Sequence, residues 1–141
     1  LRWDSLGEFM ALAASFEHLA GQHDSKKAQS LGDTLDQAVA QVLHNNKAPS
    51  RKVGELDTRG SHYYLARYWA QALADSDDAD LAAHFRSVAA DLADKETEIL
   101  DELNSAQGAP VDLGGYYLLD PDKASQAMRP SDTLNRIINA S

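Results

Sequence analysis

The sequence of 141 residues contains no cysteine. Without thiols the chain can form no disulfide framework and no cysteine-based zinc site, and it has no cysteine nucleophile. This composition fits a cytoplasmic location, which we expect for the protein. No apolar run approaches the roughly 20 residues that a membrane helix needs, and the N-terminal residues lack the pattern of an export signal. We therefore expect no membrane partner.

Positive charge is also scarce, because 13 Lys and Arg residues face 22 Asp and Glu residues and the formal net charge is -9. Such a surface repels phosphate backbones, so we expect no nucleic-acid partner. A chain of this length can bury one hydrophobic core, but it is too short for a cofactor domain plus a substrate domain. We therefore predict that residues 1–141 form one unit.

Several signatures of catalysis, nucleotide binding and metal binding are missing. The five histidines, at positions 18, 23, 44, 62 and 84, form no HExxH pair, and each alone is more often a surface or core residue than a ligand. The sequence has no GxGxxG and no GxxxxGK motif. The run that starts at Asp75 begins like a calcium loop, but Asp80 stands where the loop needs glycine and Arg86 where it needs glutamate. We therefore assign no catalytic residue and no metal ligand.

Apolar residues at spacings of three and four predict amphipathic helices along most of the chain. The first helix runs from Ser5, which forms a capping-box pattern with Glu8, to a stop at Gly21. The second follows Ser25 and ends near Asn45. Their apolar stripes are Leu6, Phe9, Ala13, Phe16 and Ala20 in the first helix, and Leu31, Leu35, Ala38 and Val42 in the second.

Two further helices are predicted in the middle of the chain. One spans about Ser61 to Ala74, and its wide apolar face predicts burial on more than one side. The other is capped by Asp77 or Asp78 and runs to about Gly108. Its charged residues lie off the apolar stripe and predict a solvated face; they are Asp94, Lys95, Glu96, Glu98, Asp101 and Glu102.

Toward the C-terminus, Asp120 and Ser131 each precede a short predicted helix. Before these helices, residues 111–117 predict one short extended segment, which cannot form a sheet by itself. The predicted fold class is therefore mainly α, with this single extended segment.

Basic side chains concentrate in the predicted loop at residues 47–60. They are Lys47, Arg51, Lys52 and Arg59. A guanidinium group can hold a phosphate with two parallel hydrogen bonds, so the cluster indicates a possible anion site. The alternative is a set of surface ion pairs, because Glu55 and Asp57 lie in the same loop. The sequence leaves both interpretations open.

Six stretches of unusual composition stand out. They are residues 2–9 (RWDSLGEF), 50–57 (SRKVGELD), 59–62 (RGSH), 68–73 (YWAQAL), 111–117 (VDLGGYY) and 127–131 (AMRPS). In this order, and over nearly the whole chain, they resemble the C-terminal region of monomeric-type NADP-dependent isocitrate dehydrogenases.

The resemblance implies an enzyme several times longer, which oxidatively decarboxylates isocitrate to 2-oxoglutarate and reduces NADP with the help of magnesium or manganese. This chain would be a helical piece of its terminal, small domain, within the C-terminal part of an isocitrate dehydrogenase-like α/β fold. The partner of the chain would be the rest of the same polypeptide, which would hold the metal and substrate ligands. That part would also supply a strand to pair with the segment around Val111.

Transferred residue by residue, the NADP contacts of the family fall on Arg2, Trp3, Asp4 and Arg51. The two arginines would hold the 2′-phosphate that distinguishes NADP from NAD, and Asp4 would accept a hydrogen bond from the ribose or the adenine. The plainer alternative is that Arg2 is only a terminal residue and Asp4 only a helix cap.

The chain opens at Leu1, one step ahead of a helix and without methionine, which indicates a piece cut from a longer protein. We expect such a piece to be inactive by itself. A different class of function is also open. The chain could be a stand-alone helical interaction module without catalysis, whose apolar stripes bind a partner protein.

Overall fold

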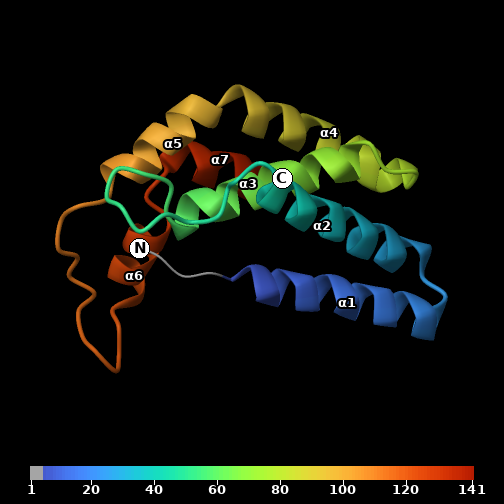
Figure 1. The fold of residues 1–141 in the computed structure, drawn as a ribbon, viewed down its shortest axis with the longest axis horizontal. Coiled ribbons are helices and arrows are strands. Elements are labelled where there is room, and N and C mark those ends of the chain that lie inside the picture. The colour runs from blue at the N-terminus through green and yellow to red at the C-terminus, as the bar shows by residue number, and fades with distance from the viewer. Residues whose placement is uncertain (1–4) are drawn as a thin grey trace.

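Seven helices follow one another along residues 5–141, the residues that the computed structural model describes (Figure 1). They are α1 (Leu6–His23), α2 (Lys26–His44), α3 (Thr58–Ala74), α4 (Ala79–Asp94), α5 (Glu96–Ser105), α6 (Pro121–Met128) and α7 (Asp132–Ala140). No strand occurs among these residues, and the prediction of a mainly α fold is confirmed. None of the described helices is both long and apolar enough to cross a membrane.

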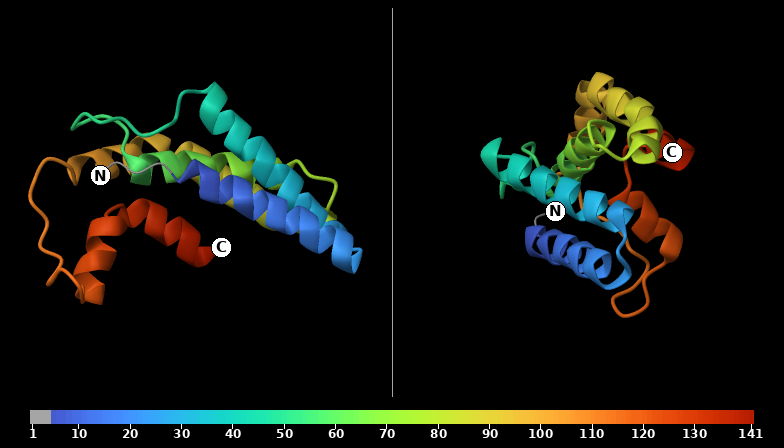
Figure 2. Two further views of the ribbon diagram at one scale, coloured as in Figure 1. Left: turned by 60° about the horizontal axis from the view of Figure 1, so that its bottom comes forward. Right: turned by 90° about the vertical axis from the view of Figure 1, so that its right-hand side faces the viewer.

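Helix α3 lies between two layers, with α1 and α2 on one side and α4 and α5 on the other (Figures 1 and 2). Toward the first layer it buries Leu65, which packs with Leu35 and Val42. Toward the second it buries Tyr63 and Tyr64. The prediction that this helix is buried on more than one side is therefore confirmed. It results from apolar side chains that go most of the way around the helix.

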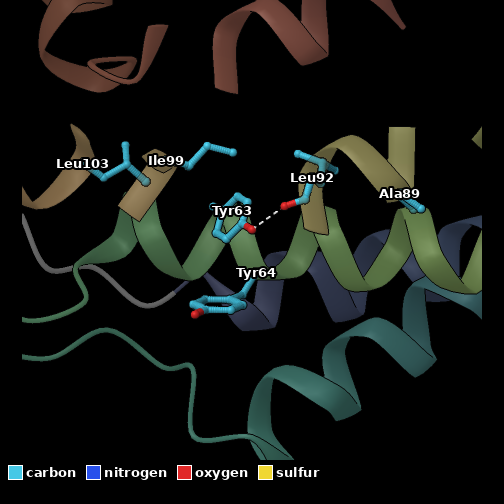
Figure 3. Close-up of a cluster of buried hydrophobic side chains, with 7 residues drawn as sticks. Tyr63, Tyr64, Ala89, Leu92, Ile99 and Leu103 are labelled. Atoms are coloured by element: carbon cyan, nitrogen blue, oxygen red, sulfur yellow. Dashed lines mark hydrogen bonds between the residues drawn. The ribbon is translucent and has the colours of Figure 1, made fainter. Parts of the chain in front are cut away.

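Figure 3 shows the apolar cluster between α3, α4 and α5, to which α4 contributes Ala89 and Leu92 and α5 contributes Ile99 and Leu103. Tyr63 is only 1% exposed, and its hydroxyl donates a hydrogen bond to the carbonyl oxygen of Leu92 at 2.7 Å. Burial raises the pKa of Tyr63 to about 12. The cluster thus buries a polar hydroxyl group together with its hydrogen-bond partner.

Most of the predicted helix starts are correct because a short side chain caps each one. The side chain of Ser25 accepts a hydrogen bond from the backbone N–H of Ala28, and Asp78 accepts one from Leu81. Asp120 and Ser131 cap α6 and α7 in the same way. These interactions reach only two or three residues along the chain, and a sequence pattern can therefore identify them.

The first helix begins directly after Ser5, as predicted, but its capping bond and its end were predicted wrongly. Ser5 makes no capping bond, because its hydroxyl contacts His62 instead, and the capping box with Glu8 does not form. Gly21 lies inside α1, which continues to His23. The helix ends where Asp24 takes up the left-handed conformation, with φ of 49°.

The two middle helices also differ from their predicted bounds. Helix α3 begins at Thr58 rather than Ser61, because the Asp57 carboxylate accepts the backbone N–H groups of Arg59 and Gly60. The long helix predicted after Asp78 is interrupted at Lys95, which closes α4 and opens α5. Figure 1 shows the resulting bend, which lets both segments follow the surface of α3.

The acidic face predicted to be solvated is partly used to hold the last helix. The Glu102 carboxylate accepts hydrogen bonds from the hydroxyl of Ser131 at 2.5 Å and from the backbone N–H of Thr133 at 3.1 Å. Glu98 accepts another from the Thr133 hydroxyl at 2.9 Å. Partial burial would raise the pKa of Glu102, but these hydrogen bonds outweigh it and the pKa is lowered. The prediction was therefore wrong for Glu102 and for Glu96, which pairs with Arg67, because both are half-buried, whereas Glu98 stays exposed as predicted.

Residues 111–117, predicted to be extended, belong to a loop between α5 and α6 that projects from the helices (Figure 2). The backbone N–H of Asp120 donates to the carbonyl oxygen of Leu113 at 2.9 Å, and Lys123 pairs with Asp112. Tyr116 and Tyr117 in this loop are 91% and 93% exposed. Pairing of the segment with a strand from elsewhere in the parent protein stays a prediction.

Replacement of Tyr63 by Phe tests the buried hydrogen bond. The Leu92 carbonyl lies in the last turn of α4, where carbonyl groups lack a helical partner, and it would lose its donor. The free energy of unfolding, measured by urea denaturation, should fall by about 1 kcal/mol. Tyr68→Phe is the matched control, because its hydroxyl takes part only in an exposed bond to Asn45. An equal loss in both variants would contradict the role of the buried bond.

Candidate functional site

The loop between α2 and α3 is closed by its own hydrogen bonds. The backbone N–H of Ser50 donates to the carbonyl oxygen of Leu56 at 2.7 Å, and the Ser50 hydroxyl donates to the Glu55 carboxylate at 2.5 Å. Gly54 turns the chain with φ of 85°, a conformation that side chains disfavour. Residues 50–56 therefore form a compact turn rather than an open connection.

A glutamine that follows α5 fastens this turn to the rest of the molecule. The Gln107 side-chain amide donates to the carbonyl oxygen of Glu55 at 2.8 Å and accepts from the backbone N–H of Gly54 at 3.0 Å. The two bonds join segments more than fifty residues apart in sequence. Side chains on the turn are thus carried by a backbone that is fixed at two points.

The four basic side chains of the predicted cluster make different contacts. Lys47 lies over the ring of Tyr64, 4.1 Å from the ring centroid, as in a cation–π contact. Lys52 pairs with Glu55 at 3.7 Å. The ion-pair interpretation of the cluster is confirmed for Lys52 and also for Arg59, which pairs with Asp57.

Arg59 is almost entirely buried and binds Asp57 through two guanidinium nitrogens, at 2.6 and 2.9 Å. Its third nitrogen donates to the carbonyl oxygen of Ala127 at 2.8 Å. This arginine therefore ties the start of α3 to the end of α6, and its charge is already neutralised. It cannot serve a phosphate without breaking these contacts.

Arg51 differs from the other three. It lies on the compact turn between Ser50 and Lys52, its side chain is exposed, and no residue within 5–141 forms a hydrogen bond or ion pair with its guanidinium group. In a chain with a net charge of -9, an exposed guanidinium that forms no ion pair with a described residue is suited to an anion from outside. The structure therefore leaves one arginine of the cluster available for a ligand.

Arg2, Trp3 and Asp4 lie outside the described residues, but the next residue, Ser5, is described. The Ser5 hydroxyl oxygen lies 2.5 Å from Nε2 of His62 on α3. The ring of Phe9 meets the same imidazole edge-on, with the ring centroids 5.3 Å apart. The start of α1 is thereby attached to α3.

A small depression is lined by residues that adjoin, in the chain, the two segments with predicted NADP contacts, residues 2–4 and Arg51. Ser5 and Leu6 line it from the start of α1, and Ala48 and Pro49 line it from the loop that follows α2. His62 lines it from α3. The residue that follows Asp4 and a residue two positions before Arg51 thus share one surface of the molecule.

Sequence reasoning did not select His62 as a site residue. It weighed each histidine alone and found no partner at a short spacing, whereas Ser5 lies 57 residues away. The available signal was its position in the stretch RGSH, which follows the basic cluster closely. A contact over such a separation appears only when α1 and α3 pack together.

A larger cavity of about 330 Å³ opens between α1, α3, α6 and α7. Its walls are mostly apolar and include Phe9, Trp69, Leu134 and Ile138. Two arginines also line it: Arg59 is paired with Asp57, and Arg129 is hydrogen-bonded to Asn135 and Asn139. This cavity thus presents apolar surface rather than free charge. Within residues 5–141, no group of three or more His, Asp or Glu side chains could hold a metal ion.

The fold and the site define a helical unit with one turn suited to bind an anionic ligand. The family model for monomeric isocitrate dehydrogenase matches residues 1–139. The chain therefore belongs to the monomeric isocitrate dehydrogenase family, as the resemblance predicts.

Individual relatives agree with this assignment. The chain is 59% identical to isocitrate dehydrogenase [NADP] 2 of Colwellia maris over 99% of its own length, and 58% identical to isocitrate dehydrogenase [NADP] of Azotobacter vinelandii over 96%. A relative in Mycobacterium tuberculosis, isocitrate dehydrogenase [NADP] 2, is 53% identical over 99%. The chain spans only 19%, 18% and 19% of the lengths of these three proteins.

The pH dependence of stability tests the environment of His62. Partial burial of the imidazole lowers the pKa of His62 below its usual 6.5, although Asp57 and Glu8 act in the opposite direction. As the pH falls below 6.5, the unfolded chain takes up the proton before the folded chain does, and folding stability is lost. His62→Gln removes this titration, so its free energy of unfolding should fall less than that of the wild type between about pH 7.5 and 5.

His18→Gln, on the exposed face of α1, controls for the loss of a histidine as such. Urea denaturation at a series of pH values gives the comparison. If His62→Gln kept the full wild-type dependence on pH, the lowered pKa would be refuted.

Proposed function

We propose that this chain forms the cofactor-contacting part of an NADP-dependent isocitrate dehydrogenase, which oxidatively decarboxylates isocitrate to 2-oxoglutarate. Membership of the family and the names of the relatives support the reaction. NADP, when bound, would accept the hydride removed from isocitrate. The residues of this chain would hold and orient the adenosine end of that cofactor.

The contacts proposed for NADP involve two segments of the chain. Arg2 and Arg51 would share the 2′-phosphate, and Asp4, with Trp3 beside it, would accept a hydrogen bond from the ribose or the adenine. The observation that carries this proposal is the exposed guanidinium of Arg51 on a fixed turn, with no described acidic partner. Its planar donors fit a phosphate and would neutralise part of its charge.

The remaining machinery is proposed to lie in the rest of the same polypeptide. That part would bind isocitrate and the magnesium or manganese ion, since the described residues offer no group of three ligands. Residues 1–141 would form a single piece of the terminal, small domain of this two-domain enzyme. A cytoplasmic location is part of the proposal, and the lack of cysteine is compatible with it.

Replacement of Arg51 by Ala in the full-length enzyme tests the cofactor role. The loss of charged hydrogen bonds to the 2′-phosphate should weaken NADP binding by about 1.5 to 3 kcal/mol in calorimetry. Binding of NAD, which lacks this phosphate, should change little. The neighbouring Lys52→Ala is the matched control, because Lys52 is already paired with Glu55.

Unchanged NADP affinity in Arg51→Ala would remove the support for a cofactor role. The stand-alone interaction module predicts that outcome, because its apolar stripes would act without any nucleotide. The same measurement therefore distinguishes the two classes of function.

The isolated chain should not oxidise isocitrate. It would lack the residues proposed to bind the substrate and the metal, so mixing it with isocitrate, NADP and Mg²⁺ or Mn²⁺ should give no increase in NADPH absorbance. The full-length enzyme under the same conditions serves as the positive control. Metal-dependent NADPH production by residues 1–141 alone would overturn this part of the proposal.

A further inference from the structure

The hydroxyl of Ser5 is used in an unusual way for its position in the chain. Serine directly before a helix commonly accepts a hydrogen bond from a backbone N–H of the first turn, and Ser25 and Ser131 do so here. Ser5 makes no such bond, and its oxygen lies 2.5 Å from Nε2 of His62. The side chain therefore connects α1 to α3 instead of stabilising its own helix.

His62 is a firm attachment point because of the helix that carries it. The residues on either side of it in the chain, Ser61 and Tyr63, are both buried. The ring of Phe9 packs edge-on against the imidazole, at an interplanar angle of 87°. A side chain bonded to His62 is thus held relative to the main core of the molecule.

The attachment lies among residues that adjoin, in the chain, both of the proposed cofactor segments. Ser5 directly follows Asp4 in the chain, and Ala48 and Pro49, which lead to Arg51, line the same depression as His62. Fixing Ser5 restricts the chain at the residue next to the proposed contacts. A restricted segment loses less conformational entropy when its ligand binds.

We propose that His62 is a positioning residue for NADP, which acts through the Ser5 hydroxyl to hold the segment carrying Arg2 and Asp4 beside the turn carrying Arg51. This inference rests on the proposed function of those residues. His62 itself touches no part of the cofactor in this arrangement. Its effect is on the affinity for NADP, because the bound arrangement of the two segments is largely prepared beforehand.

The test uses the full-length enzyme and the dissociation constant of NADP. Ser5→Ala and His62→Leu each remove one partner of the hydrogen bond and should each raise the dissociation constant by about three- to ten-fold. The double variant should be no weaker than the weaker single variant, because the second change removes an interaction that is already lost. Thermal unfolding of each variant, followed in parallel, reports whether the fold is retained.

Conservative variants separate positioning from a general loss of structure. Ser5→Thr keeps the hydroxyl, and His62→Gln keeps a side-chain nitrogen near the position of Nε2, so both should bind NADP within about two-fold of the wild type. Ser15→Ala is the matched control on α1, because the Ser15 hydroxyl bonds only to Ala11 in its own helix. Its NADP affinity should equal that of the wild type.

Three outcomes would overturn the inference in distinguishable ways. If Ser5→Ala and His62→Leu bind NADP like the wild type while Arg51→Ala does not, the cofactor site stands and the positioning role of His62 is wrong. If Arg51→Ala also binds NADP normally, the proposed cofactor site is wrong and the inference falls with it. Additive losses in the double variant would likewise refute an action through one shared hydrogen bond.

Discussion

Burial of α3 on two opposite faces is the constraint on which the rest of the structure depends. Leu65 belongs to the cluster with α1 and α2, and Tyr63 belongs to the cluster with α4 and α5. The two layers are joined chiefly through this helix, so its direction fixes where both of them lie. A helix packed from both sides also has little freedom to shift, because protein interiors are close-packed.

The candidate site uses this rigidity at the N-terminal end of α3. There Asp57 caps the helix and neutralises Arg59, which in turn holds α6 through Ala127. The first part of α3 thus supports the neighbouring loop and attaches the start of α1 through His62. The buried ion pair of Asp57 and Arg59 has a structural role, whereas Arg51 on the exposed turn forms no ion pair with another described residue.

The sequence predicted the features that depend on near neighbours. The apolar stripes identified α1 to α3 and the faces that they bury, and Asp120 and Ser131 marked the last two helix starts because their side chains bond within three residues. Contacts between distant segments could not be predicted in this way. The bond from Ser5 to His62 and the use of Glu102 to hold α7 arise only when the helices pack, so the sequence suggested a capping box and a solvated face instead. For the proposed site, the basic cluster marked the loop that carries Arg51, but spacing alone could not tell which of its arginines lacks an ion pair with a described residue.

Joint binding of one phosphate by Arg2 and Arg51 is the central proposal, and a double-mutant cycle on NADP binding by the full-length enzyme tests it most directly. If both guanidinium groups hold the 2′-phosphate, the effects of Arg2→Ala and Arg51→Ala should be coupled by about 0.5 to 3 kcal/mol, and the affinity for NAD should hardly change. Additive effects on NADP binding, or equal losses for NAD and NADP, would contradict a shared phosphate site.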